Sequence, residues 1–124
     1  MLASEQAMQL KRRVVQLNTV LERVAKAPVI VAGRAMAMPT GGRMRAVQQQ
    51  AGDVVRMVLL AWKRAEADGH WEPMVSALES AAQRLRPLIT VLEDDNRNSE
   101  AEYVYELVAD INRFIAGVKA GRIA

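Results

Sequence analysis

Residues 10–24, LKRRVVQLNTVLERV, repeat an apolar side chain at alternating intervals of four and three. Leu10, Val14, Leu17, Leu21 and Val24 carry the repeat, and this spacing places them on one face of an α-helix. The same register continues to residue 38. Because an internal proline usually kinks a helix, we predict one long helix over residues 5–37, kinked near Pro28. The alternative is a break there, followed by a separate short helix over residues 29–37.

Three further segments repeat apolar residues with the same helical period. The predicted second helix covers about residues 42–67 and ends at Gly69, since glycine is the usual residue after a helix C-terminus. The third begins at Pro73 and should be kinked at Pro87. Ser99 and Glu102 have the spacing of a capping box for the fourth, which Gly121 should end. The inward positions are Met44, Val47, Ala51, Val54, Val58, Ala61, Ala65, Met74, Leu78, Ala81, Leu85, Leu88, Leu92, Val104, Leu107, Ile111, Phe114 or Ile115, and Val118.

Four amphipathic segments with short connections are typical of a helical bundle. No stretch shows the sustained alternation of a strand. We therefore predict an all-α fold, an antiparallel up-down four-helix bundle whose first helix is long and possibly kinked. The length favours one domain over residues 1–124.

The composition is that of a globular protein, with 51% hydrophobic and 25% charged residues. The chain has no cysteine, which excludes disulfides and zinc–thiolate sites. The first residues show no signal-peptide pattern, and no apolar run approaches the ~18 residues of a membrane span. These features favour a cytoplasmic protein.

The sequence shows no catalytic motif. His70 is the only histidine, and its predicted place in a turn favours a solvated side chain. The inward positions hold no histidine or carboxylate, which argues against a ferritin-like metal site. They also hold no Arg or Lys, which argues against a helical enzyme of the chorismate mutase type. We therefore expect no enzyme activity, no metal and no cofactor.

Charge is distributed unevenly along the chain. Residues 4–67 carry 11 Lys or Arg against 4 Asp or Glu, whereas residues 68–124 carry 6 against 10. Such asymmetry indicates nucleic acid or an acidic partner, or else complementary faces of neighbouring subunits.

The basic residues recur at helical intervals. Arg12, Arg23 and Arg34 are spaced by 11 residues, or about three helical turns, and should share one face of the first helix. Arg45, Arg56 and Lys63 should share one face of the second. Two basic stripes on neighbouring helices predict a surface for backbone phosphates without sequence readout. The alternative is a set of solvated side chains whose stems cover apolar surface. The full predicted nucleic-acid-binding set is Arg12, Arg13, Arg23, Lys26, Arg34, Arg43, Arg45, Arg56, Lys63 and Arg64.

The surplus of apolar residues predicts a homo-oligomer. The off-register apolar residues exceed the needs of one bundle interior and should lie exposed at an interface; they are Val15, Val55, Leu59, Leu60 and Val75. Acidic residues also cluster at the predicted turn between the third and fourth helices. Glu93, Asp94 and Asp95 could pair there with Arg43 and Arg45 of a neighbouring subunit.

Residues 39–119 resemble the accessory variability determinant (Avd) family, small basic four-helix proteins of diversity-generating retroelements. Pro39 and Arg43, with Gln48 beyond them, match the family's entry into its second helix. The remaining matches are Leu85, Arg86, Leu88, Ile89 and Leu92 in the third helix, and Ser99, Tyr103, Ile111, Arg113, Gly117 and Lys119 in the fourth; Asn112 stands where the family has a glycine.

The resemblance implies a ring-shaped homo-oligomer, a pentamer, that binds a reverse transcriptase. It would contact template RNA or cDNA through its basic surface and assist cDNA synthesis without catalysing it. Two alternatives remain open: a small helical subunit that lines the nucleic-acid channel of a CRISPR effector complex, and a purely structural helical adaptor. A neighbouring reverse transcriptase gene would favour the Avd-like interpretation, and neighbouring CRISPR genes would favour the CRISPR subunit.

Overall fold

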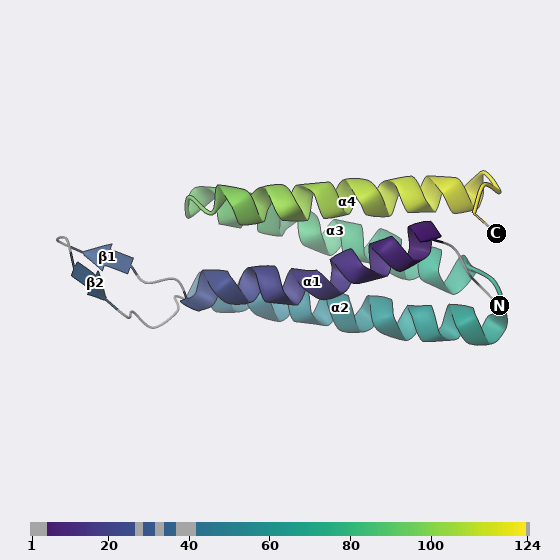
Figure 1. Ribbon diagram of the computed structural model, residues 1–124, viewed down its shortest axis with the longest axis horizontal. Coiled ribbons are helices and arrows are strands. Elements are labelled where there is room, and N and C mark those ends of the chain that lie inside the picture. The colour runs from purple at the N-terminus through teal and green to yellow at the C-terminus, as the bar shows by residue number, and fades with distance from the viewer. Residues whose placement is uncertain (1–4, 27–28, 32–33, 37–41, 124) are drawn as a thin grey trace.

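A computed structural model describes residues 5–26, 29–31, 34–36 and 42–123, and the side chains within residues 5–22 and 43–123 (Figure 1). The described residues form four helices, α1 (Glu5–Lys26), α2 (Gly42–Asp68), α3 (Glu72–Asp94) and α4 (Asn98–Lys119). They also form two short strands, β1 (Val29–Val31) and β2 (Arg34–Met36). Pro28 and Pro39, singled out in the sequence, lie outside the described residues.

The four helices pack side by side, as the predicted helical bundle requires. α2 packs against α1 and α3, and α4 packs against α3 and α1, so that α1 to α4 surround one core. Consecutive helices run in opposite directions in Figure 1. The end of α1 and the start of α2 therefore lie at the same end of the bundle as the α3–α4 turn.

The core is apolar and mostly aliphatic. Leu10, Val14, Leu17 and Leu21 of the quoted repeat are all buried, while the side chain of Val24 lies outside the described set. The only large aromatic cluster in the described core joins Trp71 to the rings of Trp62 and Phe114, each at 5.5 Å between centroids.

The predicted helix over residues 5–37 is wrong in its second part. α1 ends at Lys26, and an antiparallel hairpin follows in which Val29 pairs with Met36 and Val31 with Arg34. Figure 1 shows this hairpin beyond one end of the bundle. The β-branched run of residues 29–31 favours extended backbone, and a proline before it disfavours helix. These local preferences prevail over the continuing apolar register, so the alternative of a separate short helix over residues 29–37 is also wrong.

Three helices end just before a residue with left-handed backbone. Gly69, Asn96 and Gly121 have φ of 76°, 60° and 74°. After α4, Gly121 N–H donates to the carbonyl of Val118 and Arg122 N–H to that of Gly117, which is a Schellman motif. The predicted ends at Gly69 and Gly121 are confirmed.

Helix starts agree less well with prediction. Pro73 lies in the first turn of α3, as expected, and α3 continues through Pro87 to Asp94. The capping box predicted at Ser99 is wrong: the residue before α4 is Arg97, no side chain caps the helix there, and Ser99 lies inside its first turn. The Schellman motif at Asn96 brings the chain into the helix two residues early, since Arg97 N–H donates to the carbonyl of Leu92.

Within the described residues, no helix is long and apolar enough to cross a membrane.

Candidate nucleic-acid interface

The outer face of α2 carries a row of cations. Arg45, Arg56 and Lys63 are exposed, and their spacing brings them within about 20° of one another around the helix axis. We call these three residues the α2 stripe. Arg64 is also exposed, next to Lys63.

Few carboxylates neutralise the α2 stripe. Arg56 forms an exposed ion pair with Asp53, one turn earlier on the same helix. Among the side chains that the structure describes, Arg45, Lys63 and Arg64 form no ion pair. Exposed pairs of the Arg56–Asp53 kind are weak, so Arg56 can exchange its partner for a phosphate.

On α1 the predicted basic residues divide between two surfaces. Arg12 is exposed, whereas Arg13 turns toward α4 and pairs with Asp110. The Nζ atom of Lys11 lies 4.8 Å from the centre of the Trp62 ring on α2, a cation–π contact between the two helices. The side chains of Arg23 and Lys26 lie outside the described set.

The predicted stripe of Arg12, Arg23 and Arg34 is wrong as a single helical face. Arg34 belongs to strand β2, where it pairs with Val31 across the hairpin. The interval of 11 residues aligns side chains only along a continuous helix, and α1 ends at Lys26. Arg12 and Arg23 remain on one helix, while the Arg34 side chain lies outside the described set.

Arg43 meets the acidic turn of its own chain. Its Nη2 and Nη1 atoms lie 3.6 Å from carboxylate oxygens of Asp94 and Asp95. The sequence predicts that this cluster pairs with Arg43 and Arg45 of a neighbouring subunit; for Arg43 the structure gives an intrachain pair instead. The physical reason is the packing of α2 on α3, in which the start of α2 lies beside the end of α3.

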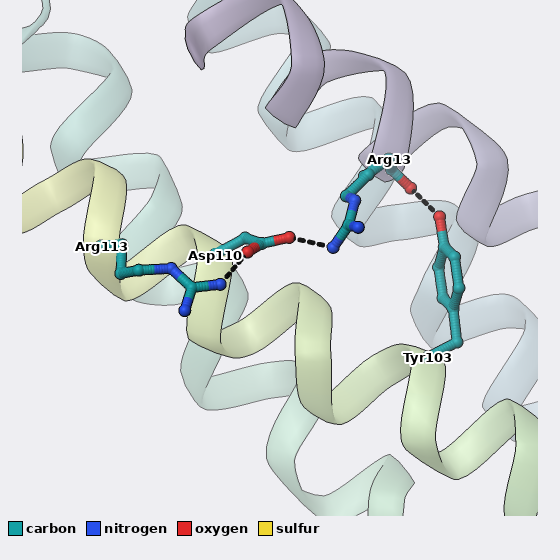
Figure 2. Close-up of polar contacts among 4 residues, drawn as sticks. All are labelled: Arg13, Tyr103, Asp110 and Arg113. Atoms are coloured by element: carbon teal, nitrogen blue, oxygen red, sulfur yellow. Dashed lines mark hydrogen bonds and ion pairs between the residues drawn. The ribbon is translucent and has the colours of Figure 1, made fainter.

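A polar network links α1 to α4 (Figure 2). One oxygen of Asp110 accepts from Arg13 and the other from Arg113, one turn further along α4. The Tyr103 hydroxyl donates a 2.6 Å hydrogen bond to the backbone carbonyl of Arg13. Burial raises the pKa of Tyr103 above its ordinary value; the nearby Arg13 cation opposes this shift, and the Asp110 carboxylate adds to it.

The same network borders a groove of about 520 Å³ between α1 and α4. Arg13, Arg113 and Arg122 line it, together with Asp110. Sequence reasoning did not include Arg113 or Arg122 in the predicted binding set, because both lie in the acidic half of the chain. Two signals in the sequence could have indicated these arginines. One is the three-residue spacing of Asp110 and Arg113, and the other is the helix stop just before Arg122.

Other predicted surface features agree only in part. Val15 and Leu60 are exposed, but Val55 is buried, and Leu59 and Val75 are partly buried against the core. Val55 and Leu59 lie beside the repeat on α2, and Val75 does so on α3, so neighbouring helices cover them. His70 is exposed in the turn after α2, and no group of three or more His, Asp or Glu that could hold a metal occurs within the described residues.

Comparisons of this chain with family models, with curated proteins and with solved structures gave no match.

Proposed function

We propose that the protein is a non-catalytic, cytoplasmic accessory protein, an antiparallel up-down four-helix bundle that binds the phosphate backbone of RNA or DNA. The α2 stripe and Arg12 supply the contacts. The observation that carries this proposal is the row of exposed cations on one face of α2, in which only Arg56 has a carboxylate partner among the described residues.

The spacing of the α2 stripe suits an extended polyanion better than a small anion. At about 1.5 Å per residue, its members follow one another at roughly 10 to 16 Å along the helix. Phosphates along one strand of B-DNA advance by about 3.4 Å, so each cation meets a phosphate several nucleotides from the next. A single small ligand cannot bridge such distances.

Sequence-independent binding is the expected mode. Trp62, Trp71 and Phe114 are buried in the core, and so none of them can stack on bases. Tyr105, 65% exposed, lies on α4 and not beside the stripe. Phosphate contacts without stacking give affinity that depends on salt and not on sequence.

The protein partner and the assembly follow from the resemblance to the Avd family. On that basis we propose that a homo-oligomer of this chain binds a reverse transcriptase and holds its template or product strand on the basic surface. Co-purification of the tagged chain with a reverse transcriptase encoded in its native host tests this part. Recovery of CRISPR effector subunits instead would contradict it.

The test of nucleic-acid binding compares two triple variants that lose the same charge. One changes the α2 stripe, Arg45→Gln, Arg56→Gln and Lys63→Gln. The control changes Arg84→Gln, Arg86→Gln and Arg97→Gln, cations of α3 and the following turn. Fluorescence anisotropy with labelled single-stranded RNA and duplex DNA, over a series of salt concentrations, measures affinity and its salt dependence.

We expect the stripe variant to bind weakly and the control to bind like wild type. Each lost phosphate contact lowers the slope of log affinity against log salt by about 0.7 to 0.9, so the stripe variant should lose about 2 to 3 units of slope. Equal weakening in both variants would show that only net charge matters, and an unchanged stripe variant would remove α2 from the interface. Either result overturns the proposal.

A further inference from the structure

The groove between α1 and α4 has the build of a small-ligand site. Its volume of about 520 Å³ lies within the range of ligand pockets. Leu10, Phe114, Gly117 and Ile123, all buried, form its apolar part. Polar side chains of α1, α4 and the C-terminal turn form the rest, namely Gln6, Gln9, Arg13, Asp110, Arg113 and Arg122.

The groove carries more positive than negative charge among the residues that the structure describes. Three guanidinium groups line it against one carboxylate. Asp110 accepts from Nη1 of Arg13 and Nη2 of Arg113, which leaves most of the five N–H groups of each guanidinium without that partner. Asp110 therefore orients both arginines while it cancels only one of the three charges.

The third guanidinium is brought to the groove by the helix end. Gly121, at φ 74°, reverses the chain after α4, and Arg122 N–H then donates to the Gly117 carbonyl at 2.9 Å. Ile123 packs its side chain over Gly117. The backbone on both sides of Arg122 is thus held, and its exposed side chain forms no ion pair among the described residues.

From this geometry we propose that the groove binds a phosphate monoester through Arg13, Arg113 and Arg122. A phosphate monoester carries a charge of about −1.5 to −2 at neutral pH, which matches the uncancelled charge of the groove. Planar guanidinium groups bind its oxygens with paired hydrogen bonds. Leu10 and the Phe114 ring offer apolar contacts to the organic part of such a ligand.

This site is separate from the proposed nucleic-acid interface. The α2 stripe lies on a helix that does not line the groove. A phosphate monoester has two sources, a free nucleotide and the 5′-phosphate at the end of a strand, and the groove recognises the chemistry that they share.

The test titrates the full chain with inorganic phosphate, adenosine 5′-monophosphate and adenosine, with binding followed by calorimetry. Wild type should bind both phosphates but not adenosine. Arg122→Gln is the decisive variant because it breaks no ion pair of the described structure. Loss of a charged hydrogen bond should weaken binding about tenfold. Arg86→Gln, an exposed cation of α3, is the matched control.

Arg113→Gln should weaken binding to a similar degree, with circular dichroism used to verify that the bundle remains folded. The triple stripe variant should bind adenosine 5′-monophosphate like wild type, which separates this site from the proposed nucleic-acid interface. A tighter complex with a 5′-phosphorylated than with a 5′-hydroxyl oligonucleotide would identify the strand end as the source; equal affinities would identify the free nucleotide. The proposal is overturned if wild type binds neither inorganic phosphate nor adenosine 5′-monophosphate. It is also overturned if Arg122→Gln binds them as wild type does.

Discussion

The hydroxyl of Tyr103 on α4 donates a 2.6 Å hydrogen bond to the backbone carbonyl of Arg13 on α1. Arg13 in turn reaches Asp110, one further residue of α4, with its guanidinium. These contacts join the first helix to the last, and so close the bundle. Tyr103 is also one of the residues on which the sequence resemblance rests, and in the structure it bridges two helices.

Removing the Tyr103 hydroxyl should loosen that closure. We expect Tyr103→Phe to lower the free energy of unfolding by about 1 kcal/mol, the usual net value of one such hydrogen bond. Urea denaturation at pH 7 measures the change. Tyr105→Phe is the control, because Tyr105 is 65% exposed and should cost almost nothing. Equal losses in the two variants would contradict a role for the Tyr103 bond.

Stability should also fall at alkaline pH, in part through Tyr103. Its pKa is raised in the folded state, chiefly by burial, so the unfolded chain releases the phenol proton at lower pH than the folded chain does. The protonated Tyr103 phenol contributes fully to the free energy of unfolding below the unfolded pKa of about 10. This contribution is lost as pH rises through the higher folded pKa. Urea midpoints between about pH 9 and 11 should therefore fall more steeply for wild type than for Tyr103→Phe. Parallel profiles would contradict this assignment, and Tyr105→Phe should retain the wild-type slope.

Neutralising the acidic turn should strengthen nucleic-acid binding without unfolding the subunit. Asp94→Asn with Asp95→Asn frees Arg43, whose two carboxylate contacts are exposed and long. Such pairs contribute at most about 1 kcal/mol, so the unfolding free energy should change little. Glu100→Gln with Glu102→Gln on α4 makes the same charge change away from Arg43. A greater gain in anisotropy-measured affinity for the first pair at low salt is expected, and equal gains would assign the effect to net charge.

Two glycine substitutions should have opposite signs. Gly121→Ala forces a side chain onto left-handed backbone, φ 74°, and should destabilise the protein by about 1 kcal/mol. Gly52→Ala lies inside α2, where the new Cβ meets its nearest atoms at 3.8 and 4.0 Å, ordinary contact distances. Alanine is the better helix former, so this change should stabilise by up to about 1 kcal/mol. Thermal unfolding of the two variants beside wild type decides both signs, and a shift in the same direction would contradict the structural assignment.

The exposed apolar side chains lead to a prediction about assembly. Leu60 is 64% exposed on α2, and Met8 and Val15 are nearly half exposed on α1. If the proposed homo-oligomer uses these residues, Leu60→Asp should lower the mass measured by light scattering, while Ala67→Asp on the same helix should not. Wild type that runs as a 13.7 kDa monomer at micromolar concentration would exclude the assembly.

Much of the bundle could be predicted from the chain alone. The period of the apolar repeat identifies the buried face of each helix because a helix returns to the same side every 3.6 residues. Leu10, Val14 and Leu17, like Leu78 and Leu85, are buried as that period requires. Gly69 and Gly121 end their helices because few other residues tolerate a positive φ. These features depend on local geometry, which neighbouring residues in the sequence specify.

Only the tertiary structure decided which partners the charged groups have. An Arg–Asp pair can form with any chain that passes within reach, and sequence spacing carries no information on contacts 97 residues apart, as for Arg13 and Asp110. The same holds for Arg43 with the acidic turn, and for the meeting of Arg13, Arg113 and Arg122 around one groove. The hairpin after Lys26 shows where periodicity alone mispredicts local structure. Its apolar residues keep a helical register, but their β-branched side chains favour strands. Periodicity determines which face of a helix is buried, whereas packing determines which side chains from distant helices meet.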